Sequence, residues 1–356
     1  MTQAAALAQY GSTGVSQGFK NRLINGNMVI DQRNAGASVS ITGGSTTYTV
    51  DRWAIFENGS MAFSAQRSTT APTGFINSLL VTTTTGAAAG ADDRSQLFQR
   101  IEGFNTADLN WGTANAKTVT LSFWVRSSLT GQFGGSLQNS NQDRSYPFSF
   151  TISSANTFEY KTITVAGDTS GTWLTDNSTG IQVLFDLGMG SNLLGTAGAW
   201  ASADYRGATG DTKLSGTTNA TLYLTGVQLE VGSTATSFDY RPYGTELALC
   251  QRYYQLSDTS PSVTVQYGGW IGTVYPSGTQ AFGLGVFKVT MRSAPTITFY
   301  DETGAAGKVL QNGIAGGIAA TAAGITVAAF NTCNRTSGTF TNGYPVLAGF
   351  TASAEL

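Results

Sequence analysis

The fold class of this chain is decided by residues 118–126, which read TVTLSFWVR. Apolar and polar side chains alternate along this stretch, and a period of two is typical of a β-strand with one face in a core. One face carries Val119, Leu121, Phe123 and Val125, and the other carries Thr120, Ser122, Trp124 and Arg126. The stretch therefore predicts a strand in a sheet that packs on one side against a hydrophobic core.

Similar short runs lie on both sides of this strand and are separated by clusters of turn residues. They cover residues 23–30, 47–56, 79–81, 96–101, 148–152, 160–165, 181–187 and 221–229. In the last run Gly226 predicts a β-bulge. Glycine-rich stretches near 83–95, 131–147 and 188–219 predict long surface loops. This succession of short strands and turns predicts a sandwich or barrel and argues against βαβ units.

The composition supports an all-β fold and limits the possible functions. The 356 residues include 44 glycines, and charged residues make up only 11%, against roughly 25% in ordinary globular domains. A formal net charge of −2 without a basic run argues against a nucleic-acid partner. No apolar stretch reaches the roughly 20 residues that span a bilayer, so membrane insertion is not expected. Histidine is absent, which removes the commonest general base and metal ligand and predicts that the chain is not an enzyme.

A single helix is predicted over residues 244–257, with Thr245 as its N-cap. Its apolar stripe includes Leu247, Cys250, Tyr253 and Tyr254. Three turns are too short to be stable alone, so we expect this stripe to pack at a seam, either between two domains or between the subunits of an oligomer. The helix separates a predicted β-sandwich over residues 21–243 from a second, smaller β domain over residues 258–356.

Few side chains suggest a catalytic or metal-binding site. Asp204 and Asp211 flank Tyr205 and Arg206 in one predicted loop. We interpret them as solvated loop carboxylates; a structural calcium ion is the alternative, since calcium takes carboxylate and carbonyl oxygens. No other cofactor is expected. Cys250 and Cys333 lie far apart in the sequence and are expected to be free and buried.

Aromatic side chains are the best candidates for a binding surface. Trp53, Trp124 and Trp173 lie in or beside strand patterns and are expected in the core. Other aromatics lie in segments rich in Gly, Ser and Thr, where an exposed ring can stack on a sugar while amides and hydroxyls bind its edge. The candidate glycan-binding residues are Tyr267, Trp270, Tyr275 and Tyr344 in the C-terminal domain, and Trp200 and Tyr205 in the sandwich. Ordinary packing under a loop is the alternative for each of them.

Eight stretches of this sequence occur in the same order and with the same spacing in a known protein family. They are residues 21–28 (NRLINGNM), 31–33 (DQR), 51–53 (DRW), 99–103 (QRIEG), 119–126 (VTLSFWVR), 225–232 (TGVQLEVG), 238–241 (FDYR) and 246–254 (ELALCQRYY). Over roughly residues 20–256 the chain thus resembles bacteriophage virion proteins described as tail fibres, capsid fibres or decoration proteins. Five arginines in these regions are interpreted as scaffold, with Asp51, Glu102 and Glu230 as expected partners: Arg22, Arg33, Arg52, Arg100 and Arg241.

The resemblance implies a fold and a set of partners. The family's main domain is similar to carbohydrate-binding modules, which implies a jelly-roll β-sandwich followed by a short helix and a second β domain. It also implies a homotrimer located in the virion and assembled in the host cytoplasm. Residues 1–20 are small and polar, and are expected either as a flexible tail or as an arm that docks on other virion proteins.

These observations lead to one main functional expectation and two alternatives. The main one is a non-catalytic tail or head fibre subunit that attaches to a host-surface glycan, with the C-terminal domain as the receptor-binding tip. The first alternative is a capsid decoration protein that stabilises the particle and binds no receptor. The second is a polysaccharide depolymerase, which would need two carboxylates about 5–10 Å apart across a sugar cleft.

Overall fold

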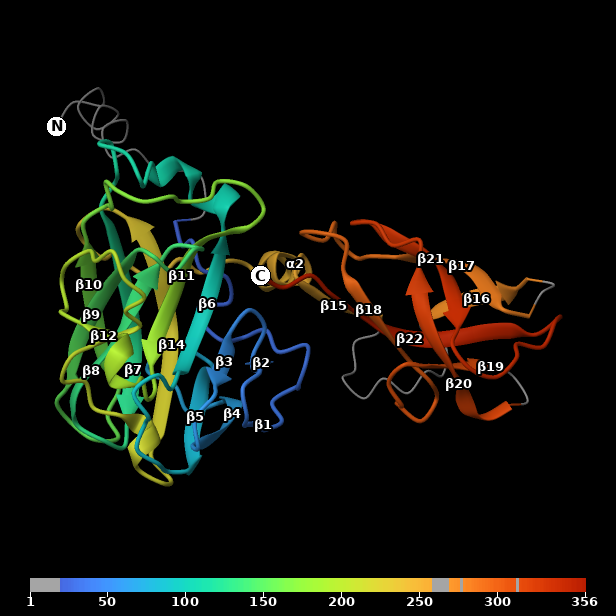
Figure 1. The fold of residues 1–356 in the computed structure, drawn as a ribbon, viewed down its shortest axis with the longest axis horizontal. Helices are drawn as coiled ribbons and strands as arrows, with labels where there is room; N and C mark the ends of the chain where they lie inside the picture. Colours follow the sequence, from blue (N-terminus) through green and yellow to red (C-terminus); the bar gives the residue numbers. More distant parts are fainter. Residues whose placement is uncertain (1–19, 258–268, 276–277, 312–313) are drawn as a thin grey trace.

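The computed structural model describes residues 20–257, 269–275, 278–311 and 314–356. Figure 1 shows that these residues form two β domains with a helix between them. The predicted all-β class is confirmed. Among the helices of the described ranges, none is long and apolar enough to cross a membrane.

The first domain is a sandwich of two antiparallel sheets. The first sheet contains, in spatial order, β1 (Val39–Ile41), β4 (Ala62–Ser68), β5 (Ser78–Thr85), β14 (Thr221–Val231), β7 (Val119–Ser127) and β10 (Glu159–Val165). The second contains β2 (Thr46–Tyr48), β3 (Ala54–Glu57), β6 (Ser95–Glu102), β11 (Thr179–Asp186), β8 (Gly131–Gln138) and β9 (Ser145–Ile152). The chain crosses repeatedly from one sheet to the other, as in a jelly roll.

Short elements connect these strands. Two-residue strands β12 (Leu194–Gly195) and β13 (Gly207–Ala208) pair in parallel. Single 3₁₀ turns cover Gly103–Asn105, Ala107–Leu109, Ser191–Leu193 and Leu214–Gly216.

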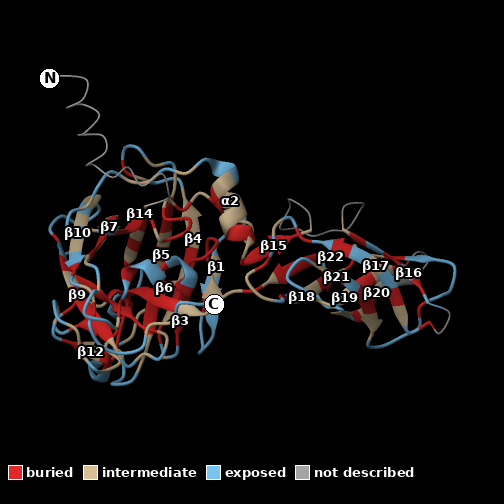
Figure 2. Cartoon of the chain, turned by 90° about the horizontal axis from the view of Figure 1, so that it is seen from above, coloured by how far each residue is buried: buried red, intermediate tan, exposed pale blue. Residues whose placement is uncertain are grey.

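The core between the sheets is built by the alternation that the sequence shows in residues 118–126. Leu121 and Phe123 of β7 are fully buried, and the ring of Phe123 contacts Phe150 and Phe185 edge-on at centroid distances of 5.0 and 5.1 Å. Trp53 is also fully buried, as predicted. Figure 2 shows the buried residues gathered inside the sandwich. Because a fully buried large apolar side chain contributes about 1.5–3 kcal/mol, this core is the main source of the domain's stability.

One predicted loop is wrong. Residues 131–147, expected as a surface loop, contain β8 and the start of β9. Glycine has a low strand propensity, and this led to the loop prediction. Here the glycines lie where neighbouring groups approach the backbone closely. A side chain at Gly135 would collide with the carbonyl group of Leu184 on the neighbouring β11, and one at Gly134 would collide with the Asp211 carboxylate.

One predicted strand is also absent, since residues 23–30 form bends and turns. Asn25 and Met28 have left-handed φ angles of 56° and 59°, which a strand does not allow. The Asn25 amide nitrogen donates to the Ile30 carbonyl at 2.8 Å, and the Ile30 N–H donates back to Asn25 Oδ1 at 2.9 Å. A side chain thus provides the hydrogen bonds that a neighbouring strand would have made.

The second domain is a small closed barrel. Its strands pair in the order β22 (Pro345–Ser353), β16 (Trp270–Val274), β17 (Gln280–Val286), β21 (Ala329–Arg335), β20 (Ile314–Ala323) and β19 (Lys308–Gln311). The ring closes because β19 also pairs with β22. The far end of β22 pairs with β15 (Tyr254–Leu256) and β18 (Thr296–Tyr300). Cys250 at the joint and Cys333 in the barrel core are free and buried, as expected.

The helix between the domains is α2 (Tyr243–Gln251), which is shorter than the predicted 244–257. Pro242 occupies the N-cap position, so the prediction of Thr245 as N-cap is wrong. The chain leaves the helix after Gln251 because the residues that follow pair with β22, with Tyr254 opposite Ser353. The pairing of these residues with β22 therefore decides their conformation, although their apolar pattern is typical of a helix.

The predicted seam residues lie at the joint between the two domains. Cys250 and Tyr253 are fully buried and pack with Ile24 and Ile30 of the sandwich, and Leu247 lies partly buried against the same cluster. Tyr254 is buried at the start of β15. The alternative role of these residues in a trimer stays a prediction.

A buried ionic cluster fixes the joint, close to the C-terminal end of the chain that Figure 1 places beside α2. Glu355 lies between two arginines of the sandwich: its Oε1 is 2.7 Å from Arg33 Nη2, and its Oε2 pairs with Arg52 Nη1. The side chains of Arg52 and Glu355 are only 2% and 7% exposed. The Arg52 guanidinium lies 3.5 Å from the ring centroid of Tyr253, a cation–π contact.

A second ion pair spans the same joint. Arg252 donates to Glu102 from Nε at 3.0 Å and from Nη2 at 2.6 Å, and the Tyr253 hydroxyl donates to Glu102 at 2.7 Å. The recurring arginines are therefore scaffold, but their expected partners were wrong in part. Arg33 and Arg52 pair with Glu355 across the joint, and Glu102 pairs with Arg252.

We expect Glu355→Gln to loosen the joint, because it removes the carboxylate that pairs with both Arg33 and Arg52 in a buried site. Breaking a buried pair of this kind costs about 3 kcal/mol or more, which corresponds to roughly 100-fold faster local opening. Hydrogen exchange of the β15 amides measures this opening. The exposed Asp92→Asn is the control and should leave β15 exchange unchanged. Equal exchange in both variants would show that Glu355 does not hold the joint.

Candidate functional site

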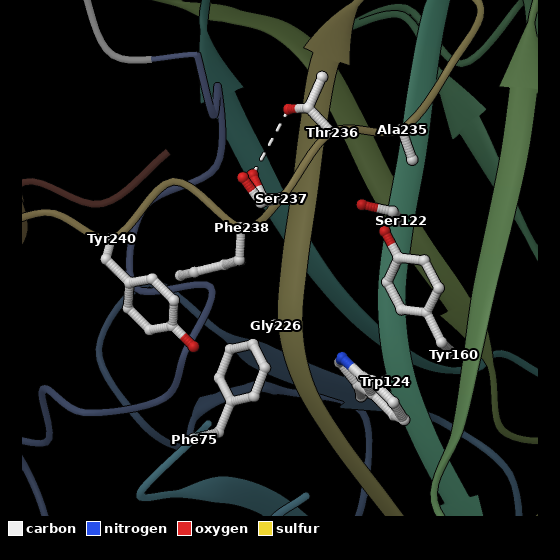
Figure 3. A pocket seen from close by; sticks show the side chains of 10 residues that line it. All are labelled: Phe75, Ser122, Trp124, Tyr160, Gly226, Ala235, Thr236, Ser237, Phe238 and Tyr240. Atoms are coloured by element: carbon white, nitrogen blue, oxygen red, sulfur yellow. Dashed lines mark hydrogen bonds between the residues drawn. The ribbon is translucent and has the colours of Figure 1, made fainter. Parts of the chain in front are cut away.

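A groove lies on the outer face of the first sheet, on the side turned away from the core. It encloses about 530 Å³ and is lined by Phe75, Ser122, Trp124, Tyr160, Gly226, Ala235, Thr236, Ser237, Phe238 and Tyr240. We call it the aromatic groove. Figure 3 shows Phe75, Phe238 and Tyr240 on one side of β14, and Trp124 and Tyr160 on the other.

The strand pairing determines one wall of the aromatic groove. Trp124 is on the outward face of β7, and the register places it opposite Tyr160 of β10. Their ring centroids are 5.3 Å apart. Trp124 was expected in the core; the structure corrects this, since the alternation that buries Phe123 and Val125 turns Trp124 outward.

Three rings from two loops form the other wall. Phe238 and Tyr240, which follow β14, pack at a centroid distance of 4.9 Å, and Phe75, which precedes β5, packs on them at 5.2 and 5.6 Å. The Tyr240 hydroxyl donates to the Gly74 carbonyl at 2.6 Å and joins the two loops. Partial burial raises the pKa of Tyr240 above its usual value, so this hydroxyl keeps its proton.

Gly226 separates the two walls, at the bulge that the sequence predicts. The register of β14 against β7 shifts between Thr225 and Gln228, and Gly226 has a left-handed φ of 62°. A side chain on Gly226 would collide with the ring of Phe75 and crowd that of Trp124. Glycine is therefore needed here both for the backbone conformation and to leave the groove open.

The loop that carries Thr236 and Ser237 is anchored by a buried carboxylate. Glu230 accepts hydrogen bonds from the Thr236 N–H at 2.8 Å, from the Thr236 hydroxyl at 2.7 Å and from Gln228 Nε2 at 2.8 Å. The hydroxyls of Tyr160 and Ser237 make no hydrogen bond to another residue in the described ranges. The groove thus combines carbon-rich ring faces with hydroxyls available to a ligand, and no charged side chain lines it.

The chain can be compared with known proteins. No protein-family model and no curated protein matches it. Among solved structures it is similar to a putative sugar-binding protein from Bacteroides thetaiotaomicron, at 10% identity and a TM-score of 0.34, over 60% of this chain and 100% of that one. It is also similar to a family 11 carbohydrate-binding module of a Clostridium thermocellum cellulase, at 12% identity and a TM-score of 0.26, over 55% of this chain and 99% of that one.

The enzymatically active domain of tailspike protein 4 from bacteriophage CBA120 aligns at 10% identity and a TM-score of 0.30, over 60% of this chain. The chain spans only 21% of the length of that tailspike chain. At such identities and scores these likenesses assign neither a family nor a site.

The glycan-binding residues predicted in the C-terminal domain are not all available to a ligand. Tyr267 lies outside the described residues. Trp270 is only 2% exposed and packs on Phe299 in the barrel core, which rules out a stacking platform there. Tyr275 and Tyr344 are 56% and 48% exposed, and both lie next to the pairing of β16 with β22 at one end of the barrel.

The two residues predicted in the sandwich lie apart from the aromatic groove. Trp200 packs against Trp111 and Trp173, and its indole N–H donates to the Ala166 carbonyl at 2.7 Å. The Tyr205 ring lies over Gly195 and leaves no room for a side chain there. Neither residue lines the groove.

Sequence reasoning missed the aromatic groove for an identifiable reason. Trp124 could have been found, because it falls on the polar face of the 118–126 pattern. Phe238 and Tyr240 occur in one of the stretches that carry the family resemblance, but nothing local marks them as exposed. Their proximity to Phe75 results from tertiary packing of distant loops.

The carboxylates considered for calcium do not form a cluster. Asp204 pairs with Arg206 at 3.0 Å and with Arg94 at 3.4 Å, whereas Asp211 accepts from the Ala208 N–H at 2.9 Å. Across the ranges that the structure describes, no group of three His, Cys, Asp or Glu residues is placed to hold a metal ion.

Burial raises the pKa of Asp211 to about 6, and the nearby charge of Asp186 adds to this shift. An unfolded chain titrates Asp near 3.9, so between about pH 4 and pH 6 the folded state binds more protons than the unfolded state. The contribution of Asp211 to stability is therefore complete below about pH 4 and is lost as the pH rises through 6.

We expect Asp211→Asn to flatten the pH dependence of the free energy of unfolding between pH 4 and pH 7, as measured by urea unfolding. A variant with the wild-type slope would contradict the assignment.

Proposed function

We propose that this chain is a non-catalytic glycan-binding subunit of a bacteriophage particle, and that the aromatic groove holds the glycan. The observation that carries the proposal is the pair of aromatic walls on either side of Gly226. Sugar rings have an apolar C–H face, which stacks on aromatic side chains, and hydroxyls at the edge, which need fixed polar groups. The groove offers both, and its volume of about 530 Å³ suits more than one sugar ring.

The lining of the groove supports binding without catalysis. Glycoside hydrolysis requires two carboxyl groups on either side of the scissile bond. None of the residues that line the groove is acidic, and Glu230, the carboxylate that anchors its loop, is occupied by Thr236 and Gln228. The proposal therefore involves no cofactor and no covalent step.

The location in a virion rests on the resemblance carried by the eight sequence stretches. It includes a homotrimer and docking of residues 1–20 on other virion proteins, as a tail or head fibre. The outer face of the barrel supports self-association, because adjacent strands β16 and β17 expose Ile271, Leu284 and Val286 there. Exposed apolar clusters of this kind are typical of protein–protein contacts.

The barrel offers a second candidate for glycan recognition. Tyr275 and Tyr344 are exposed near one end of the barrel, and the partly exposed ring of Phe282 packs edge-on against Tyr275 at a centroid distance of 5.9 Å. Point variants separate the two candidates without removing the barrel, whose last residues hold the joint.

We expect Trp124→Ala and Tyr160→Ala each to weaken glycan binding about tenfold or more, since loss of one stacking ring removes about 1.4 kcal/mol. A panel of neutral oligosaccharides would be screened first, and calorimetry with the best ligand would give the affinities. Tyr223→Ala is the matched control, because Tyr223 is on the same sheet but does not line the groove.

Other results would favour the alternatives. Loss of binding only in Tyr275→Ala or Tyr344→Ala would move the site to the barrel. No binding by the wild-type chain would favour a decoration protein that only stabilises the particle. Release of new reducing ends from a polysaccharide would overturn the non-catalytic assignment.

The proposed trimer leads to a separate prediction. Light scattering should give three times the mass of one chain, and Leu284→Lys should lower that mass because it places a charge in the apolar contact. Ile76→Lys, which changes an exposed apolar residue of the sandwich, is the control. A wild-type monomer, or dissociation only in the control variant, would contradict the proposed contact.

A further inference from the structure

A second pocket lies at the end of the sandwich, where the 3₁₀ turn Ala107–Leu109 faces the segment that contains Trp173. It encloses about 270 Å³ and shares no lining residue with the aromatic groove. Its walls include the indole rings of Trp111 and Trp173, whose centroids are 4.7 Å apart and whose planes meet at 80°. The two rings form a right-angled apolar corner, which we call the tryptophan corner.

The rings of the tryptophan corner are held in place by backbone hydrogen bonds. The Trp111 indole N–H donates to the Lys117 carbonyl at 2.8 Å, and that of Trp173 donates to the Ser170 carbonyl at 3.1 Å. Trp200 packs against both rings at centroid distances of 5.3 and 5.4 Å. Trp111 is only 7% exposed, so the ring that a ligand can reach is the half-buried Trp173. Because the indole N–H of Trp173 is occupied, this ring offers a ligand only carbon surface.

Two polar side chains lie at the mouth of this pocket. Asn110 and Thr175 are exposed, and neither side chain makes a hydrogen bond to another residue within the described ranges. Asn110 has a left-handed φ of 54°, and its carbonyl accepts from the Thr113 hydroxyl at 2.7 Å. The backbone of this turn is therefore fixed while its amide side chain is available to a ligand.

Gly112 allows the two sides of the pocket to approach each other. It has a left-handed φ of 84°, and a side chain there would collide with the carbonyl group of Gly171 and crowd the Trp173 ring. The close approach of these two segments gives the corner its shape.

We propose that the tryptophan corner is a second saccharide site that takes one neutral pyranose ring. The C–H face of the ring stacks on the half-buried Trp173 indole, which the buried Trp111 ring supports from the side, and its hydroxyls bond to the Asn110 amide and the Thr175 hydroxyl. A neutral sugar is indicated because no charged side chain lines the pocket. A single ring is indicated because about 270 Å³ is at the small end of ligand pockets, near 300 Å³.

This site adds to the proposed groove and does not depend on it. Two separate sites on one chain can hold two points of the same polysaccharide, so that weak contacts combine into stronger attachment. Each site alone is expected to bind weakly, with a dissociation constant on the order of 1 mM for a single ring.

Fluorine NMR on the full chain labelled with 5-fluorotryptophan tests the proposal. The chain has 6 tryptophans, so each signal can be assigned by a single Trp→Phe variant. The probes are the methyl glycosides of glucose, galactose, N-acetylglucosamine and rhamnose, titrated one at a time. We expect at least one of them to shift the Trp111 and Trp173 signals in a saturable manner.

Two variants preserve the tryptophans and test the polar mouth. Asn110→Gly keeps a residue that tolerates the left-handed backbone but removes the amide, and Thr175→Lys places a long side chain across the opening. Each should weaken the titration about tenfold or more. Thr130→Lys introduces the same change at an exposed threonine elsewhere and should leave it unchanged.

The possible results are distinguishable. If none of the four glycosides shifts the Trp111 and Trp173 signals, the tryptophan corner is not a saccharide site. The same conclusion follows if these signals shift equally in all three variants. A saturable shift of the Trp124 signal alone would likewise overturn this inference, while leaving the aromatic groove as the single glycan site.

Discussion

A buried carboxylate, Glu355, is the centre of the contacts that hold the two domains of this chain together. Glu355 pairs with Arg33 and Arg52, and these arginines in turn stack on the rings of Tyr254 and Tyr253. Charges this deeply buried are costly unless every one is paired, so the cluster forms completely or not at all. The joint therefore has a defined geometry, and the barrel keeps one orientation relative to the sandwich.

Within the sandwich, one pattern produces both the core and the aromatic groove. The strand that buries Phe123 must turn Trp124 to the opposite face, since successive side chains of a strand alternate. Cross-strand pairing then brings Tyr160 to Trp124, and the bulge at Gly226 leaves room for the Phe75 loop to approach. The aromatic groove is thus a consequence of ordinary sheet geometry combined with one irregular position.

What the sequence predicts well is local. Residues 119–126 lie in β7 as expected, and Gly226 is at a bulge, because alternation and glycine placement act over a few neighbouring residues. Trp270 was misplaced because its glycine-rich surroundings are typical of a loop, whereas it begins β16 and points into the barrel. The partner of Arg33 could not have been found, since Glu355 is 322 positions away and no local pattern links them. The groove was missed for the same reason, because its walls meet only in the folded chain.

The barrel is entered and left at the same place. Its first strand, β15, pairs with the end of β22, so that Tyr254 is opposite Ser353 just before the chain reaches Glu355. The residues between Tyr254 and Ser353 are one continuous segment of the chain, and its two ends are paired with each other. A segment of different length or shape could take its place with no change in the sandwich, as long as the paired ends, Glu355 and the hydrogen bond from Arg292 to the Asn177 carbonyl were kept. The architecture therefore allows the barrel to differ in size or shape while the sandwich and the joint stay the same.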